Sequence, residues 1–71
     1  MLNQNKLYRP YWRLYEAAQR VAMGFSVRNI AFSHGMASAL AIEVSEGEEL
    51  DRYLNLVNTL ADQRYKEIGY E

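Results

Sequence analysis

The 71-residue sequence contains no cysteine and a single histidine, and these shortages exclude several classes of protein. Without cysteine no disulfide can form, and His34 alone cannot supply the ligands of a common zinc site. No apolar run approaches the roughly 20 residues of a membrane-spanning helix. Residues 1–9 are polar and lack the apolar core of a signal peptide. We therefore expect a cytoplasmic chain with no cofactor, no metal and no membrane segment.

Catalytic and phosphate-binding patterns are missing as well. No serine or cysteine nucleophile with a matching acid can be assigned to His34, and a histidine beside Gly35 is typical of a turn or cap. The chain has no glycine-rich phosphate loop. The acidic run at residues 46–51 lacks the oxygen-ligand spacing of a calcium loop. The sequence predicts that the protein is not an enzyme.

The composition is that of a folded domain, with 49% hydrophobic and 24% charged residues. Residues 1–71 contain no linker, repeat or low-complexity tract, so we expect a single domain. A chain of this length hides only roughly 60% of the surface that its unfolded form exposes. Since disulfides and metals are excluded, we expect a second chain to supply the missing support, most simply as a homodimer.

The clearest helical pattern lies between Ser45 and Ile68. Leu56 widens the apolar arc of this segment to about half of the helix circumference, at about 100° per residue. One neighbouring helix cannot cover such an arc, so the segment is expected to contact two elements. The other apolar residues recur at steps of three and four: Leu50, Tyr53, Leu54, Val57, Leu60, Ala61, Tyr65 and Ile68.

Both ends of this C-terminal helix carry recognisable signals. Ser45 and Glu48 have the spacing of a capping box, in which each side chain bonds the backbone N–H of the other residue. Acidic residues follow at the start, and Arg64 and Lys66 stand near the end, as the helix dipole favours. Gly69 is expected to terminate the helix.

A first helix is predicted at about residues 10–23. Pro10 suits its first turn, where the missing N–H is not needed, and Gly24 is expected to end it. Residues 1–8 show little pattern and are expected to form a loose arm or an added half-turn. The apolar face of this helix consists of Tyr11, Leu14, Tyr15, Ala18, Val21, Ala22 and Phe25.

Trp12 and Met23 lie off that face and, three turns apart, share a second one. An exposed tryptophan on a small helix is unfavourable unless it meets another surface. We therefore predict that Trp12 and Met23 bind a partner together with Leu56. In the expected homodimer these residues form a seam built from the C-terminal helix and part of the first helix.

The middle segment, residues 25–44, allows two interpretations. As helices, Ser26 caps the first of a short pair and Gly35 separates it from the second. As a hairpin, apolar residues alternate on both sides of a turn at His34 and Gly35. Alanine is the best helix former and a poor strand former, so the alanine-rich sequence favours the helical pair. The predicted fold is all-α, with the long C-terminal helix packed on the N-terminal helix. The alternative is an α+β fold with a central β-hairpin.

Residues 24–31 read Gly-Phe-Ser-Val-Arg-Asn-Ile-Ala and residues 35–38 read Gly-Met-Ala-Ser. Over residues 24–44 the chain resembles the helix-turn-helix of resolvase-like and homeodomain-like DNA-binding domains, where a Gly-x-Ser-x-Arg-x-Ile-Ala run opens the first helix. The resemblance implies that Ala31 lies at the helix crossing and that Gly35 forms the turn. It also implies a DNA-binding transcriptional regulator, which is the alternative function.

The chemistry of the second helix of that pair favours a protein partner over DNA. Base edges are read by Arg, Lys, Asn and Gln, and residues 37–44 contain none of them. Ala41 replaces the branched residue usual late in such a helix, and the acidic residues that follow oppose phosphate. An apolar face suits a protein groove or a dimer seam, so Ile42 joins the candidate partner-binding residues. The expected outward positions are Ala37, Ser38, Ala39, Ile42 and Glu43.

Charge is divided unevenly along the chain. Residues 1–35 carry five cations and one anion (+4), whereas residues 36–71 carry three cations and eight anions (−5). Such asymmetry provides either complementary faces for self-contact or a basic patch for an anionic partner. Weak contact with nucleic acid is therefore expected at most from Arg9, Arg13, Arg20 and Arg28. We predict a small accessory or regulatory protein that acts by protein–protein interaction, of a size common among phage and mobile-element proteins.

Overall fold

The computed structural model describes the backbone of residues 2–69 and the side chains of residues 12–69. Within this range the chain forms three helices and no strand: α1 (Leu2–Ala22), α2 (Val27–Val44) and α3 (Gly47–Glu67). The predicted all-α class is confirmed, and the β-hairpin alternative is wrong.

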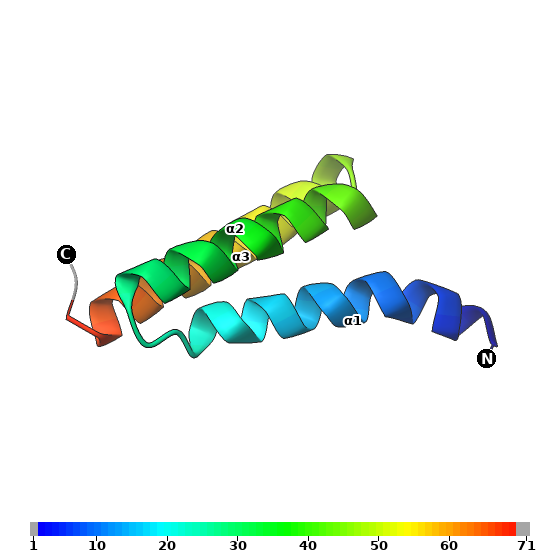
Figure 1. Cartoon of the computed structure of the whole chain (residues 1–71). Helices are drawn as coiled ribbons and strands as arrows, with labels where there is room; N and C mark the ends of the chain where they lie inside the picture. Colours follow the sequence, from blue (N-terminus) through cyan, green and yellow to red (C-terminus); the bar gives the residue numbers. More distant parts are fainter. Residues whose placement is uncertain (1, 70–71) are drawn as a thin grey trace.

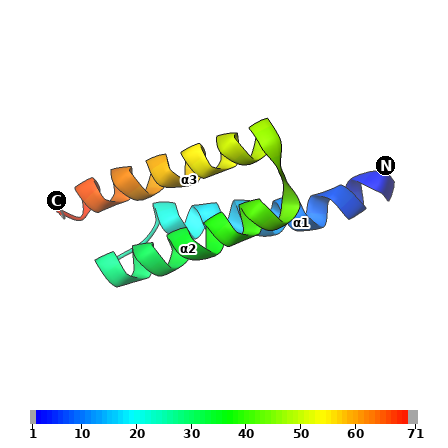
Figure 2. The same ribbon diagram turned by 90° about the horizontal axis from the view of Figure 1, so that it is seen from above.

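The three helices pack against one another in pairs and are joined by short loops (Figure 1). Figure 2 shows α3 to one side of α2, while α2 crosses in front of α1. The N-terminal end of α1 extends past the loop between α2 and α3 in both views. The molecule is consequently elongated, with extents of 43 × 21 × 15 Å.

α1 begins well before the predicted start, so the expected loose arm at residues 1–8 is wrong for Leu2 onward. Met1 lies outside the described residues. Pro10 lies inside the helix, not in its first turn. An interior proline removes one backbone hydrogen bond and its ring crowds the carbonyl four residues earlier, so it weakens a helix by about 3 kcal/mol, but its φ is near the helical value and the helix continues on both sides. The predicted end is close, because α1 stops at Ala22 and Gly24 lies in the following turn.

α2 is one helix, so the predicted break at Gly35 and the short helical pair are wrong. An interior glycine destabilises a helix by only about 1 kcal/mol relative to alanine, which flanking alanines and packing on two neighbours can offset. His34 accordingly lies inside α2, not in a turn. Its Nε2 lies 2.6 Å from Oδ1 of Asn58, joining α2 to α3.

The start of α2 agrees with the prediction. The hydroxyl of Ser26 accepts a hydrogen bond from the Asn29 N–H at 3.1 Å. In return, the Asn29 side-chain oxygen accepts from the Phe25 N–H at 3.3 Å. This reciprocal pair satisfies the Asn29 N–H, a donor that the first turn of a helix leaves open, and the Phe25 N–H just before the helix.

Ser45 caps the other helix from the one predicted. It ends α2, where its N–H and its hydroxyl both donate to the Ala41 carbonyl, at 3.0 and 2.6 Å. The N-cap of α3 is Glu46, which makes no side-chain capping bond. Gly47 follows with φ of +65°, a conformation that favours glycine and moves the start of α3 beyond Ser45.

The remaining end signals of α3 are confirmed. Glu48 and Glu49 stand in its first turn, and Arg64 and Lys66 in its last. Gly69 follows the helix with φ of +89° and donates its N–H to the Lys66 carbonyl at 3.1 Å. Left-handed glycine after the last turn is a common helix terminator.

Arg64 connects the end of α3 to the turn between α1 and α2. Its Nε donates to the Gly24 carbonyl at 2.6 Å, and its guanidinium pairs with Glu67 at 2.9 Å. Gly24 is itself buried, and a Cβ added there would approach Ile30 Cγ1 closer than 3.0 Å. This corner of the bundle therefore depends on a close backbone approach that only glycine allows.

The core between the helices is built largely from small side chains. The largest fully buried side chains are Ile30, Val21 and Val57. Leu14 adds one more large residue, and the other buried apolar residues are Ala17, Ala18, Ala37, Ala41 and Ala61. Many of the described large apolar side chains lie outside this core, and the exposed ones are Trp12, Tyr15, Met23, Phe25, Val27, Phe32, Met36, Ile42 and Leu56.

Candidate functional site

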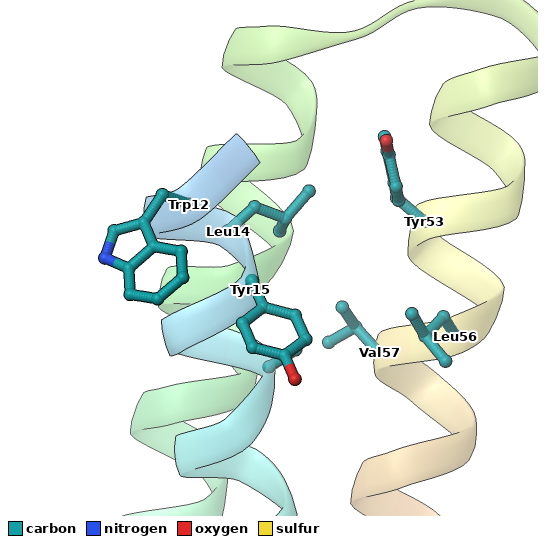
Figure 3. A pocket seen from close by; sticks show the side chains of 7 residues that line it. Trp12, Leu14, Tyr15, Tyr53, Leu56 and Val57 are labelled. Atoms are coloured by element: carbon teal, nitrogen blue, oxygen red, sulfur yellow. The ribbon is translucent and has the colours of Figure 1, made fainter. Parts of the chain in front are cut away.

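A groove of about 580 Å³ runs between α1 and α3. Three of the exposed large apolar residues line it: Trp12, Tyr15 and Leu56. α1 and α3 contribute seven lining residues: Trp12, Leu14, Tyr15, Ala18, Tyr53, Leu56 and Val57 (Figure 3).

The floor of the groove is apolar and its rim is aromatic. Leu14 and Val57 are buried, and Figure 3 shows their side chains pointing toward each other between the two helices. Trp12 and Tyr15 stand on α1 with ring centroids 6.0 Å apart and an interplanar angle of 33°. They are 58% and 57% exposed, and Leu56 on α3 is 51% exposed. Three large side chains therefore remain half in solvent around one hollow.

The local sequence explains why this hollow exists. Leu14 and Ala18 lie one turn apart on α1 and both are buried against the bundle. Alanine at position 18 fills little of the space that a leucine or phenylalanine would take. Tyr15 lies beside them with its ring at the edge of the gap (Figure 3). A small residue between larger ones leaves a groove that the chain itself does not fill.

The chemistry available in the groove is that of a binding site. Among the described side chains, the lining contains no carboxylate, amine, imidazole or aliphatic hydroxyl that could act as acid, base or nucleophile. The polar atoms of the lining side chains are the hydroxyls of Tyr15 and Tyr53 and the indole N–H of Trp12. Apolar walls with a few orienting polar groups suit an apolar surface that carries a polar edge.

The structure brings together two of the four predicted partner-binding residues. Trp12 and Leu56, on different helices, line the same groove. Met23 follows the end of α1 and is 71% exposed, but it does not line the groove. Ile42 lies on α2, where it is 61% exposed, and belongs to another face.

The described candidate nucleic-acid contacts do not line the groove. Arg13, Arg20 and Arg28 are exposed, whereas the side chain of Arg9 lies outside the described residues. Arg13 and Arg20 are two turns apart and share one face of α1. Arg20 also borders a smaller hollow of about 290 Å³ between α1 and α2, together with Ala17, Asn29, Phe32, Ser33 and Met36.

Sequence reasoning missed most of the exposed apolar residues of α2 and the preceding turn. Phe25, Phe32 and Met36 are exposed, although Phe25 was assigned to the packed face of the first helix. The sequence did hold a signal for these exposed residues, since the segment 27–44 has no polar face. Its only ionisable residues are Arg28, His34 and Glu43. A helix that is apolar on all sides normally has all sides covered.

Neither a metal site nor a membrane span emerges from the described residues. Side chains of residues 12–69 form no group of three or more potential metal ligands. Over residues 2–69, none of the three helices combines the length and apolarity that crossing a bilayer requires. Comparison with protein-family models, curated proteins and solved structures gave no match.

Proposed function

We propose that this chain is a small, non-enzymatic accessory or regulatory protein of the cytoplasm that acts by binding another protein. The ligand is an amphipathic helix of the partner, seated in the groove between α1 and α3. The observation that carries the proposal is the groove itself, with Trp12, Tyr15 and Leu56 standing half exposed around an apolar floor.

The energetics favour an occupied groove. Fully burying one large apolar side chain stabilises by about 1.5–3 kcal/mol. Covering the exposed halves of Trp12, Tyr15 and Leu56 is therefore worth on the order of 3 kcal/mol before any new contacts are counted. Tryptophan and tyrosine are also the residues most often found as binding hot spots, because they combine a large rigid surface with a polar edge.

The shape of the groove favours a helix as its occupant. Two helices form its walls, and an amphipathic helix laid between them can insert side chains at i, i+3, i+4 and i+7. The hydroxyl of Tyr15 and the N–H of Trp12 supply polar groups that can bond the edge of such a helix. α3 already packs on both α1 and α2, and its exposed Leu56 remains for a helix in the groove to cover.

The alternative, a DNA-binding regulator, receives less support. Base recognition depends on Arg, Lys, Asn or Gln at the contact face. Along the later half of α2 the exposed positions are Ala39, Ile42 and Glu43, and acidic residues follow in α3. Arg13, Arg20 and Arg28 allow only non-specific contact with phosphates, which should weaken steeply with salt.

The test is capture of the partner by wild-type protein and by groove variants. The double variant Trp12→Ala/Leu56→Ala should lose a discrete partner that wild type retains. Thr59→Ala is the matched control, since Thr59 is exposed on α3 and does not line the groove. Circular dichroism should show that all three proteins are equally helical.

Binding to a pool of random DNA duplexes at about 0.15 M salt completes the test. Selection of one sequence, lost on changing Arg28 or Ser38, would establish the DNA-binding alternative and reject the proposal. Capture that is equally strong with the double variant would also reject it.

A further inference from the structure

We propose that α2 is a self-association surface, on which a second copy of this chain packs its own α2 in antiparallel orientation. The two-fold axis passes between Gly35 and Met36, so that Arg28 of each copy meets Glu43 of the other. The surface, called the outer face of α2, consists of exposed residues: Arg28, Ala31, Phe32, Gly35, Met36, Ala39, Ile42 and Glu43.

The outer face is apolar and uncovered. At about 100° per residue its members fall within roughly 140° of the helix circumference, on the side away from buried Ile30, Ala37 and Ala41. Phe32 is 68% exposed, and Met36 and Ile42 are also exposed. The outer face of α2 therefore carries apolar residues of the kind found in a buried core, yet these residues are exposed to solvent.

The charges of the outer face are self-complementary. Arg28 stands near its start and Glu43 near its end, separated by fifteen residues or about 22 Å along the helix. Among the described side chains, neither of them has an ion-pair partner within the chain. Antiparallel packing about the midpoint places the cation of each copy beside the anion of the other, twice per dimer. Parallel packing would instead place like charges together, so this pattern specifies the orientation.

Side-chain size follows the same symmetry. When residue 28 faces residue 43 of the second copy, Phe32 faces Ala39 and Met36 faces Gly35. Phe32 and Met36 therefore each meet a small residue, as interlocking helices require. A Cβ added at Gly35 would have nothing within 4 Å, so in the single chain there is room above this glycine for the side chain of a second copy.

This seam differs from the one predicted by sequence reasoning, which joined the C-terminal helix to part of the first helix. None of the seven groove-lining residues belongs to α2, so a dimer formed through α2 leaves both grooves open. The inference is therefore independent of the proposed function: charge variants on α2 test the dimer, and groove variants test the binding of another protein.

The experiment is sedimentation equilibrium of the full chain across a concentration series, with a charge swap. Wild type should reach twice the mass of the 8.3-kDa chain. Arg28→Glu and Glu43→Arg should each weaken the dimer by about tenfold or more, because each places two like-charge contacts in the seam. The double variant Arg28→Glu/Glu43→Arg should restore dimerisation to within about threefold of wild type, since it reverses both signs together.

Gly35→Leu provides a second, steric test. It should weaken the dimer by about tenfold or more by filling the space for the facing Met36, while the single chain remains helical. Leu56→Glu is the control, and it should leave the dimer unchanged. A monomer at every concentration up to about millimolar, where a standard interface would associate, would overturn the proposal. Loss of the dimer in Leu56→Glu but not in the charge variants would also overturn it and place the seam in the groove.

Discussion

Two glycines of this chain should respond in opposite directions to the same substitution by alanine. Gly35 lies inside α2 and is exposed, whereas Gly24 lies in the α1–α2 turn and is buried. Neither has a positive φ, so alanine is acceptable to the backbone at both positions. The difference between them is the space around an added methyl group.

At Gly35 that space is open, with nothing within 4 Å of an added Cβ. Gly35→Ala should therefore stabilise the single chain by about 1 kcal/mol, the difference in helix propensity between the two residues. For a domain of this size the melting temperature should rise by about 4–8 °C.

At Gly24 the added Cβ would approach Ile30 Cγ1 closer than 3.0 Å and the Asn29 side-chain oxygen at 3.1 Å. Ile30 is fully buried, and the Asn29 oxygen already accepts the Phe25 N–H, so neither atom can withdraw freely. Gly24→Ala should therefore destabilise the chain by about 1–3 kcal/mol, as overpacking of a core does.

Urea melts followed by circular dichroism measure both changes. They are best made in the Arg28→Glu background at low micromolar concentration, where self-association is suppressed and only the single chain is compared. If Gly24→Ala melts with or above the parent protein, the close packing of this turn on Ile30 is wrong. If Gly35→Ala melts below it, Gly35 does not lie inside an exposed helix.

Two further substitutions test the ends of α3. Glu46→Asp should raise stability by about 0.5–1 kcal/mol in urea melts, because Glu46 makes no capping bond and aspartate is a preferred N-cap; no gain would mean that α3 begins elsewhere. Arg64→Met should lower stability by about 1.5 kcal/mol through loss of the bond to the Gly24 carbonyl. Lys66→Met is its control, and equal losses in the two variants would contradict a specific role for Arg64.

Local signals in this sequence predicted local structure well. The Ser26 cap, the end of α1 near Gly24, the end of α3 at Gly69 and the periodic face of α3 all depend on residues within one or two turns of each other. Such features are encoded by side chains that bond the nearest backbone groups. They therefore follow from spacing alone.

Where the sequence signals at a residue allow two different structures, spacing alone could not predict which structure forms. Gly35 breaks a helix only if packing does not offset its propensity, and here α2 packs on two neighbours. Ser45 has the chemistry to cap α3 but ends α2 instead, because Gly47 adopts a positive φ and shifts the start of α3. Pro10 allows either a start or an interior position, and helical backbone on both sides decides it.

The sequence predicted two residues of the candidate site, Trp12 and Leu56, but it did not predict the groove that they line. Trp12 and Leu56 were recognised one at a time, since each lies outside or at the edge of an apolar stripe. That they line one groove is a consequence of how α1 and α3 pack, which no periodicity reveals. The small core residues that force large side chains outward were visible in the sequence only as an abundance of alanine.

The most direct measurement of the central claim is site-specific photo-crosslinking in the cells that encode this protein. A benzophenone side chain replaces Leu56 at the groove or Thr59 on the exposed side of α3. We predict a discrete covalent adduct with another protein from position 56 that position 59 does not give, and its loss when Trp12→Ala is added. Absence of any adduct from position 56, or equal labelling from both positions, would contradict the claim that the groove between α1 and α3 binds a partner.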